Sequence, residues 1–174
     1  MILSGYDILK YMSQGMLRIE PFDMSVIREN GVDLRIADEI AVQKESSIIF
    51  NSLSVEDAEK YMVKMKCGEY IRIPARKFVL ATTLETVRLS ASLVGFCCLR
   101  STWARMGLMI PPTIIDAGFE GQLTIEIYNA GEYTVSIPVG SRFLHVVFST
   151  TTGPCIPYAG KYQHQKGVTL PKKD

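Results

Sequence analysis

The chain has 174 residues, a length typical of one folded domain, and its hydrophobic content of 47% excludes an intrinsically disordered protein. The formal net charge is +1, which argues against a broad basic face and therefore against a nucleic-acid partner. No apolar run reaches the roughly 20 residues that span a bilayer, and the first residues lack a signal-peptide pattern. We expect a cytoplasmic protein with no membrane partner.

The first predicted element is a short helix over about residues 4–14. Ser4 followed by Asp7 is typical of a helix N-cap, and Gly15 is a typical stop. A strand is predicted at Val32–Ile36, where apolar and polar residues alternate directly after the turn signal Asn30-Gly31. Further short strands are predicted at residues 47–50, 69–73, 78–82, 93–99, 122–128, 133–137 and 143–148.

Short strands at this spacing, separated by glycine turns, indicate a mainly β fold of the sandwich or jelly-roll type. Residues 55–65 fit either a helix or a charged excursion between strands. The stretch from Gly153 lacks periodicity, and we expect residues 153–174 to form a C-terminal tail that extends away from the core.

None of the four cysteines has the spacing of a zinc knuckle. Cys97 and Cys98 are adjacent, so in a strand they face opposite sides and cannot both bind one ion. We interpret the cysteines as free thiols and predict no protein-bound metal. His145 is interpreted as a hydrogen-bonded core or interface residue.

Four segments carry residues suited to binding or catalysis. Residues 100–105 hold two arginines and two hydroxyl side chains directly after an apolar strand, a combination that suits phosphate oxygens. In residues 115–121 an acid precedes two glycines that bracket an aromatic residue, so the backbone could approach a sugar closely. Glu126 lies on a predicted strand, and a pocket there would raise its pKa and suit it to proton transfer. Residues 158–169 form a basic, aromatic strap able to close over phosphates.

Taken alone, each segment also fits an ordinary structural role: a strand end, a tight turn, a solvent-facing acid or a disordered tail. Their order along the chain, together with Ile2-Leu3-Ser4 and Asn30–Arg35, resembles the dCTP deaminase family of the dUTPase-like superfamily. The resemblance is densest between Arg100 and Glu126. It implies a distorted jelly-roll β-barrel with a short N-terminal helix, one domain over residues 1–174, and a homotrimer whose sites are shared between neighbours.

The resemblance also implies a role for each block. Glu126 matches the general base, which takes a proton from a water that attacks C4 of cytosine. Ser101 and Arg105 match the other two catalytic residues, and Asp116 matches the acid that holds the deoxyribose 3′-hydroxyl. The whole set of matched catalytic and substrate-binding residues is Arg100, Ser101, Thr102, Trp103, Ala104, Arg105, Asp116, Phe119, Thr124, Ile125, Glu126, Tyr158, Lys161 and Gln165.

Within this set, Phe119 lies beside the sugar, and the backbone of Thr124 and Ile125 contacts the pyrimidine. Tyr158, Lys161 and Gln165 belong to the tail that closes over the nucleotide. Mg²⁺ accompanies the triphosphate without taking part in the chemistry. A catalytic zinc is not expected, because the H-x-E and P-C-x-x-C pattern of zinc deaminases is absent from the sequence.

Three other functions remain open on the sequence. A dUTPase is disfavoured because the tail lacks the Gly-rich motif of those enzymes. A bifunctional enzyme would cut dUTP further to dUMP and diphosphate. In such enzymes the loop that precedes the acid matching Asp116 is longer than the corresponding residues 106–115 of this chain. Residues 106–115 are two residues shorter than in many dCTP deaminases and contain Pro111-Pro112. A non-catalytic trimeric jelly-roll module is the third.

Overall fold

The computed structural model describes residues 1–44 and 58–173. The strand predicted at residues 47–50 lies outside these ranges. Three helical segments are present: α1 (Gly5–Ser13), α2 (Ala58–Tyr61) and α3 (Ser101–Arg105), with a 3-10 turn at Met24–Val26. The strands are β1 (Leu17–Glu20), β2 (Ile27–Arg28), β3 (Gly31–Gln43), β4 (Met62–Lys66), β5 (Tyr70–Ile73), β6 (Phe78–Leu89), β7 (Leu93–Leu99), β8 (Leu108–Met109), β9 (Thr113–Ile115), β10 (Glu120–Asn129), β11 (Val135–Pro138) and β12 (Arg142–Thr150).

The predicted N-terminal helix is confirmed, together with its cap. Ser4 accepts a hydrogen bond from the backbone N–H of Asp7 at 3.2 Å, and the Asp7 carboxylate accepts from the Ser4 N–H at 3.1 Å. The Asp7 carboxylate also accepts from the Ser4 hydroxyl at 2.7 Å, and this bond, followed by the one from the Ser4 N–H, lowers the pKa of Asp7. The chain leaves the helix through Gly15, whose φ of +71° favours glycine.

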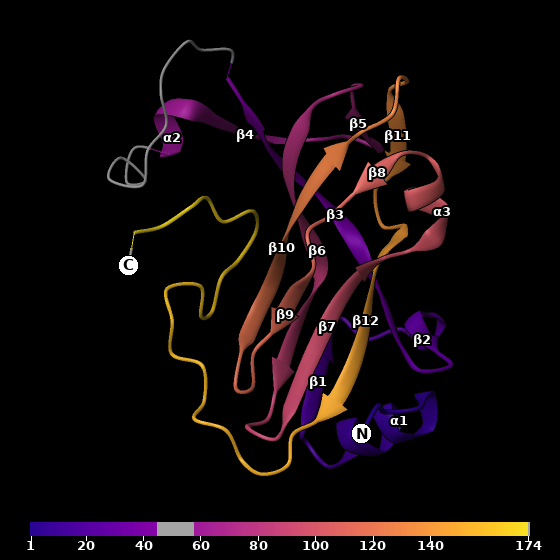
Figure 1. Cartoon of the computed structure of the whole chain (residues 1–174), viewed down its shortest axis with the longest axis vertical. Coiled ribbons are helices and arrows are strands. Elements are labelled where there is room, and N and C mark those ends of the chain that lie inside the picture. Colours follow the sequence, from indigo (N-terminus) through magenta and orange to yellow (C-terminus); the bar gives the residue numbers. More distant parts are fainter. Residues whose placement is uncertain (45–57, 174) are drawn as a thin grey trace.

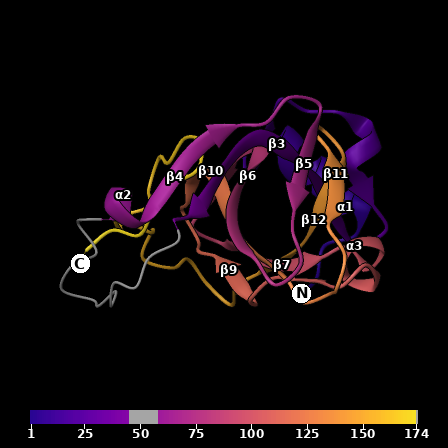
Figure 2. The same ribbon diagram turned by 90° about the horizontal axis from the view of Figure 1, so that it is seen from above.

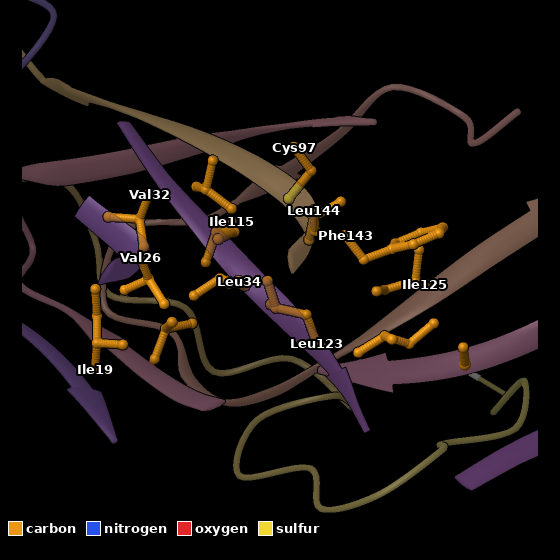
Figure 3. Close-up of a cluster of buried hydrophobic side chains, with 14 of the residues drawn as sticks. Ile19, Val26, Val32, Leu34, Cys97, Ile115, Leu123, Ile125, Phe143 and Leu144 are labelled. Carbon is orange, nitrogen blue, oxygen red and sulfur yellow. The ribbon is translucent and has the colours of Figure 1, made fainter. Parts of the chain in front are cut away.

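The strands form one antiparallel, curled sheet, so the prediction of a mainly β fold is confirmed (Figures 1 and 2). Ten strands belong to this sheet, and its main path runs β8-β10-β6-β3-β12-β7-β9, while β5 and β11 pair separately. The curled sheet encloses a core of aliphatic and aromatic side chains, part of which is drawn in Figure 3. Alternation decides which side chains enter it: on β10, Leu123, Ile125 and Ile127 are buried, while Thr124 and Glu126 lie on the other face.

The curled sheet leaves a seam between β9 and β10. β9 is the last strand of the pairing path and β10 stands next to β8 at its other end, yet the two strands follow one another in the chain, joined by the turn at residues 116–119. One edge of β10 pairs with β6 along its length, whereas on the other edge β8 pairs with Tyr128 and Asn129. In the described part of the chain, no strand pairs with that second edge between Leu123 and Ile127. Backbone N–H and C=O groups there are available to other partners.

Two expectations about local structure change. Within residues 55–65, α2 ends at Tyr61 and β4 begins at Met62, so a helix through residue 65 is wrong. The tail does not extend away from the core. Through residue 173 it has no regular secondary structure, but Val168 and Leu170 are buried at 0% and 8% exposure in an apolar cluster with Ala41 of β3 and Leu80 of β6. The burial of these two apolar residues, at alternate positions, contributes to anchoring this stretch against the cost of ordering it.

Candidate active site

Glu126 lines two adjoining pockets, and Thr124 lines both as well. The larger has a volume of about 470 Å³ and lies between the sheet and the tail, and the smaller, of about 120 Å³, lies at the seam between β9 and β10. The larger pocket falls within the usual range for small-molecule sites of about 300–1,000 Å³. The smaller has room for little more than a single ring.

The environment of Glu126 favours proton transfer. Burial is the main influence on this carboxyl group and raises its pKa above the ordinary glutamate value. A carboxylate with a raised pKa gives up and takes back a proton more readily near neutral pH. The nearby Cys97 thiol, which also lines the smaller pocket, has a pKa raised to about 11, chiefly by burial, so it stays neutral. Glu126 is therefore the charged group suited to acid–base work in this pocket.

The smaller pocket offers backbone groups to a flat ligand. Thr113, Ile114 and Ile115 of β9 line one side of it, and the unpaired edge of β10 from Leu123 to Glu126 lines the other. A ring that entered the seam would meet the backbone N–H and C=O groups of β10 as a neighbouring strand would. This arrangement suits a heterocycle that carries both donors and acceptors on its edge.

The larger pocket is roofed by the tail. Tyr162, Gln165, Thr169 and Pro171 line it from that side, and β3, α2, β4 and β6 complete its walls. Sequence reasoning found Gln165 but did not single out Tyr162, and it missed the wall residues Gln43, Lys44, Tyr61, Met62, Phe78 and Leu80. No local motif marks these wall residues, because only the pairing of distant strands brings them together.

The two glycines of the 115–121 segment serve the tail. Gly118 has a φ of +82°, and a Cβ placed there would come within 2.7 Å of the Pro157 Cβ. At Gly121 a Cβ would lie 3.0 Å from the backbone nitrogen of Gln165. The close backbone approach predicted for a ligand is thus made by the protein's own tail. Gln163 fastens it further by accepting a bond from the Glu120 N–H at 2.9 Å and donating to the Gly118 carbonyl at 2.9 Å.

Four predicted site residues of this turn and of the tail line neither pocket: Asp116, Phe119, Tyr158 and Lys161. Phe119 is buried, and its ring centroid lies 5.9 Å from that of Tyr158. Asp116, which directly follows β9 and precedes Phe119 by three residues, is exposed. Lys161 is also exposed, with its ammonium 5.5 Å from the Tyr162 ring centroid. The tail therefore joins Phe119 to the pocket roof through Tyr158 and Tyr162.

Residues 100–105 line neither pocket. They begin α3, and two of them are fixed by structural contacts: the Arg100 Nε lies 2.8 Å from the buried Asp33 carboxylate, and the Trp103 indole donates to the Arg142 carbonyl at 2.9 Å. The Trp103 side chain is itself buried. The other four residues of this segment are exposed: Ser101, Thr102, Ala104 and Arg105. Within one chain, the structure does not bring Ser101 and Arg105 to Glu126.

The Asp33 carboxylate has further side-chain partners around the base of α3. His145 Nδ1 lies 2.8 Å from it, in agreement with the interpretation of this histidine as a hydrogen-bonded residue. Arg28 and Arg142 lie 3.8 and 3.9 Å away. The buried carboxylate thus holds β3, β12 and the start of α3 together.

The cysteines are unpaired, and no group of three or more His, Cys, Asp or Glu side chains in residues 1–44 and 58–173 could hold a metal ion. No helix in those same ranges is long and apolar enough to cross a membrane.

Fold and site together define a jelly-roll protein with a ring-sized seam beside a carboxylate suited to proton transfer. The sequence profile of the dCTP deaminase-like family matches residues 2–151, and the chain therefore belongs to that family. A dCTP deaminase of Caldivirga maquilingensis is 48% identical over 99% of this chain and 96% of its own length. A dCTP deaminase of Pyrobaculum aerophilum is 45% identical over 99% and 97%.

Two other comparisons bear on fold and activity. A probable deoxyuridine 5′-triphosphate nucleotidohydrolase of Sulfolobus islandicus rod-shaped virus 1 is 48% identical over the full length of both chains. The crystal structure of the 2′-deoxycytidine 5′-triphosphate deaminase from Agrobacterium tumefaciens has a TM-score of 0.68 and 16% identity, covering 84% of this chain and 47% of that one. It supports the predicted jelly-roll fold.

Proposed function

We propose that this protein hydrolyses dCTP to dUTP and ammonia, with Glu126 as the proton shuttle. The observation that carries the proposal is the desolvated Glu126 carboxylate at the junction of both pockets. Its carboxylate accepts a proton from water, and the resulting hydroxide bonds to C4 of the cytosine. The proton then passes to the amino group, the C4–N bond breaks and ammonia leaves; the proton of the added hydroxyl moves to N3, so that C4 becomes the carbonyl of uracil.

In this proposal the pyrimidine enters the seam between β9 and β10. The volume of about 120 Å³ suits one ring, and the free edge of β10 beside Thr124 and Ile125 offers hydrogen-bonding groups to its edge. Asp116 and Phe119 follow at the turn that closes the seam, where they would meet the deoxyribose. The tail, residues 153–174, closes over the nucleotide through Tyr158, Lys161 and Gln165 and belongs to the same domain as residues 1–152.

Ser101 and Arg105 would complete the site of a neighbouring copy in a homotrimer. In support, α3 lines neither pocket of its own chain. Apolar side chains are also exposed on the strands that flank the seam: Phe96 and Ile114, paired on β7 and β9, are 42% and 58% exposed, and Met109 on β8 is 58% exposed. Burial of such a patch is a common driving force for closed assemblies.

The proposed chemistry uses no catalytic zinc. A zinc deaminase needs His and Cys ligands beside a separate glutamate, and the sequence lacks that pattern. Mg²⁺ is treated as part of the substrate, bound by the phosphate oxygens of dCTP.

A second candidate is cleavage of dUTP, either alone or after deamination. The viral relative with a dUTPase name favours it. Against it, only Ile110, Pro111 and Pro112 separate β8 from β9, and two prolines remove two backbone donors from this loop. A loop this short and poor in donors is badly suited to hold a second water near the α-phosphate.

One experiment separates these outcomes. The protein is incubated with dCTP and Mg²⁺, ammonia is measured, and the nucleotides are resolved by ion-exchange chromatography. Ammonia and dUTP in equal amounts support the proposal, whereas dUMP and diphosphate without accumulating dUTP identify a bifunctional enzyme. Hydrolysis of added dUTP without any ammonia from dCTP would identify a dUTPase, and no reaction with either nucleotide would favour a non-catalytic module.

A further inference from the structure

Three consecutive backbone N–H groups of the tail donate to three side chains of the sheet. The Gly167 N–H donates to Gln122 Oε1 at 2.7 Å, the Val168 N–H to Glu39 Oε1 at 2.8 Å, and the Thr169 N–H to Thr124 Oγ1 at 3.1 Å. Without these acceptors, an irregular segment pressed against a sheet would leave donors unsatisfied.

Glu39 is the charged member of this group and has no other assigned role. It lies half-buried on β3, and the tail runs alongside β10 (Figure 1). A hydrogen bond to a carboxylate is stronger than one to a neutral oxygen. The donor is the N–H of Val168, the first of the two buried tail residues Val168 and Leu170.

The tail is shaped to fit this carboxylate. Gly167 has a φ of +63°, and a Cβ at that position would lie 2.9 Å from Glu39 Oε1 and 3.0 Å from Oε2. Another residue would therefore be strained in its backbone, and its Cβ would force the Glu39 carboxylate to shift away from the tail. Gln122 supports the same turn, because its amide nitrogen donates to the Thr83 carbonyl at 2.8 Å while its oxygen holds Gly167.

We propose that Glu39, supported by Gln122, is a positioning residue that latches the tail and thereby holds Gln165 and Tyr162 at the roof of the pocket beside Glu126. Gln165 lies two residues before the latched Gly167, so its position depends on that turn. Glu39 contacts no substrate in this scheme and acts through the tail alone. The effect on catalysis rests on the proposed deaminase function, whereas the latch itself does not.

The latch is tested by hydrogen exchange of the tail amides in the full chain without nucleotide. Glu39→Ala should speed exchange at Val168 by roughly tenfold or more, the size expected for loss of a charged hydrogen bond. Glu39→Gln keeps an acceptor oxygen and should restore most of the protection. Asp38→Asn is the matched control, because this neighbouring acid on β3 pairs with exposed Lys66 instead of the tail. Gly167→Ala should free the tail with Glu39 intact.

Kinetics with dCTP then tests positioning. In Glu39→Ala, KM should rise roughly tenfold while kcat falls less than about threefold, and Glu39→Gln should recover the KM. Unchanged exchange at Val168 in Glu39→Ala overturns the latch, and faster exchange with an unaltered KM overturns the positioning role. If the wild-type chain releases no ammonia from dCTP, the deaminase proposal fails, while the exchange measurement still decides the latch.

Discussion

Replacing Glu126 by Gln separates catalysis from folding. The substitution keeps nearly the same volume and removes the charge, so the pocket should still bind dCTP. A positioned general base contributes about 10²–10⁴-fold to rate, and we expect kcat to fall by that factor. At 25 °C this equals a rise of about 3–5 kcal/mol in the activation barrier.

Stability should move in the opposite direction. Burial raises the pKa of Glu126 in the folded chain above its unfolded value, so the folded state holds this proton more tightly. The resulting contribution to stability is fully present below the unfolded pKa, near 4.5, and is lost as pH rises through the folded pKa. Above that window the charged carboxylate carries a constant penalty. Glu126→Gln removes the penalty and should unfold at a slightly higher urea concentration than wild type at pH 7.

The assay is the initial rate of ammonia release from dCTP, with dCTP binding measured by calorimetry. Glu120→Gln is the matched control, because this acid lies on the same strand with an exposed side chain near Arg88. It should keep most of the activity. A Glu126→Gln protein that retains more than about a tenth of wild-type turnover would refute the role of Glu126 as the proton shuttle.

Four further outcomes are expected. Light scattering at micromolar concentration should give the mass of three chains of 19.4 kDa each, and a monomer would contradict the shared site. Val168→Ala should lower the free energy of unfolding by roughly 1.5 kcal/mol, since two fully buried carbons are removed at about 0.8 kcal/mol each. Truncation before Lys161 should lower both stability and dCTP affinity. A truncated chain with full activity would rule out a role for the tail in the reaction. Glu85→Ala should destabilise by about 3 kcal/mol in urea unfolding, because it leaves Arg35 without the carboxylate now 2.6 Å from its Nε, and a change below about 1 kcal/mol would show that the buried pair contributes little.

The tail illustrates where reasoning from sequence reaches its limit. Its lack of periodicity correctly excluded a helix or strand, and its composition drew attention to Tyr158, Lys161 and Gln165. Nothing in residues 153–174 reveals that Val168 and Leu170 have a partner surface, because that surface is built by Ala41 and Leu80 from distant strands. The sequence likewise does not reveal that the Glu39 carboxylate accepts from the Val168 N–H, because β3 and the tail are far apart in the chain.

What the sequence determined by itself was local. The Ser4–Asp7 cap and the alternation that turns Thr124 and Glu126 away from the core depend on residues close together in the chain, and each family motif is a short segment that can be read from the sequence. Only the tertiary structure decided that β9 and β10 face each other across an open seam, that Arg100 is held by Asp33, and that the tail roofs its own sheet. These features arise when the sheet curls and brings distant strands into contact. The spacing of side chains along the chain does not show which strand edge will stay unpaired or which carboxylate will be buried.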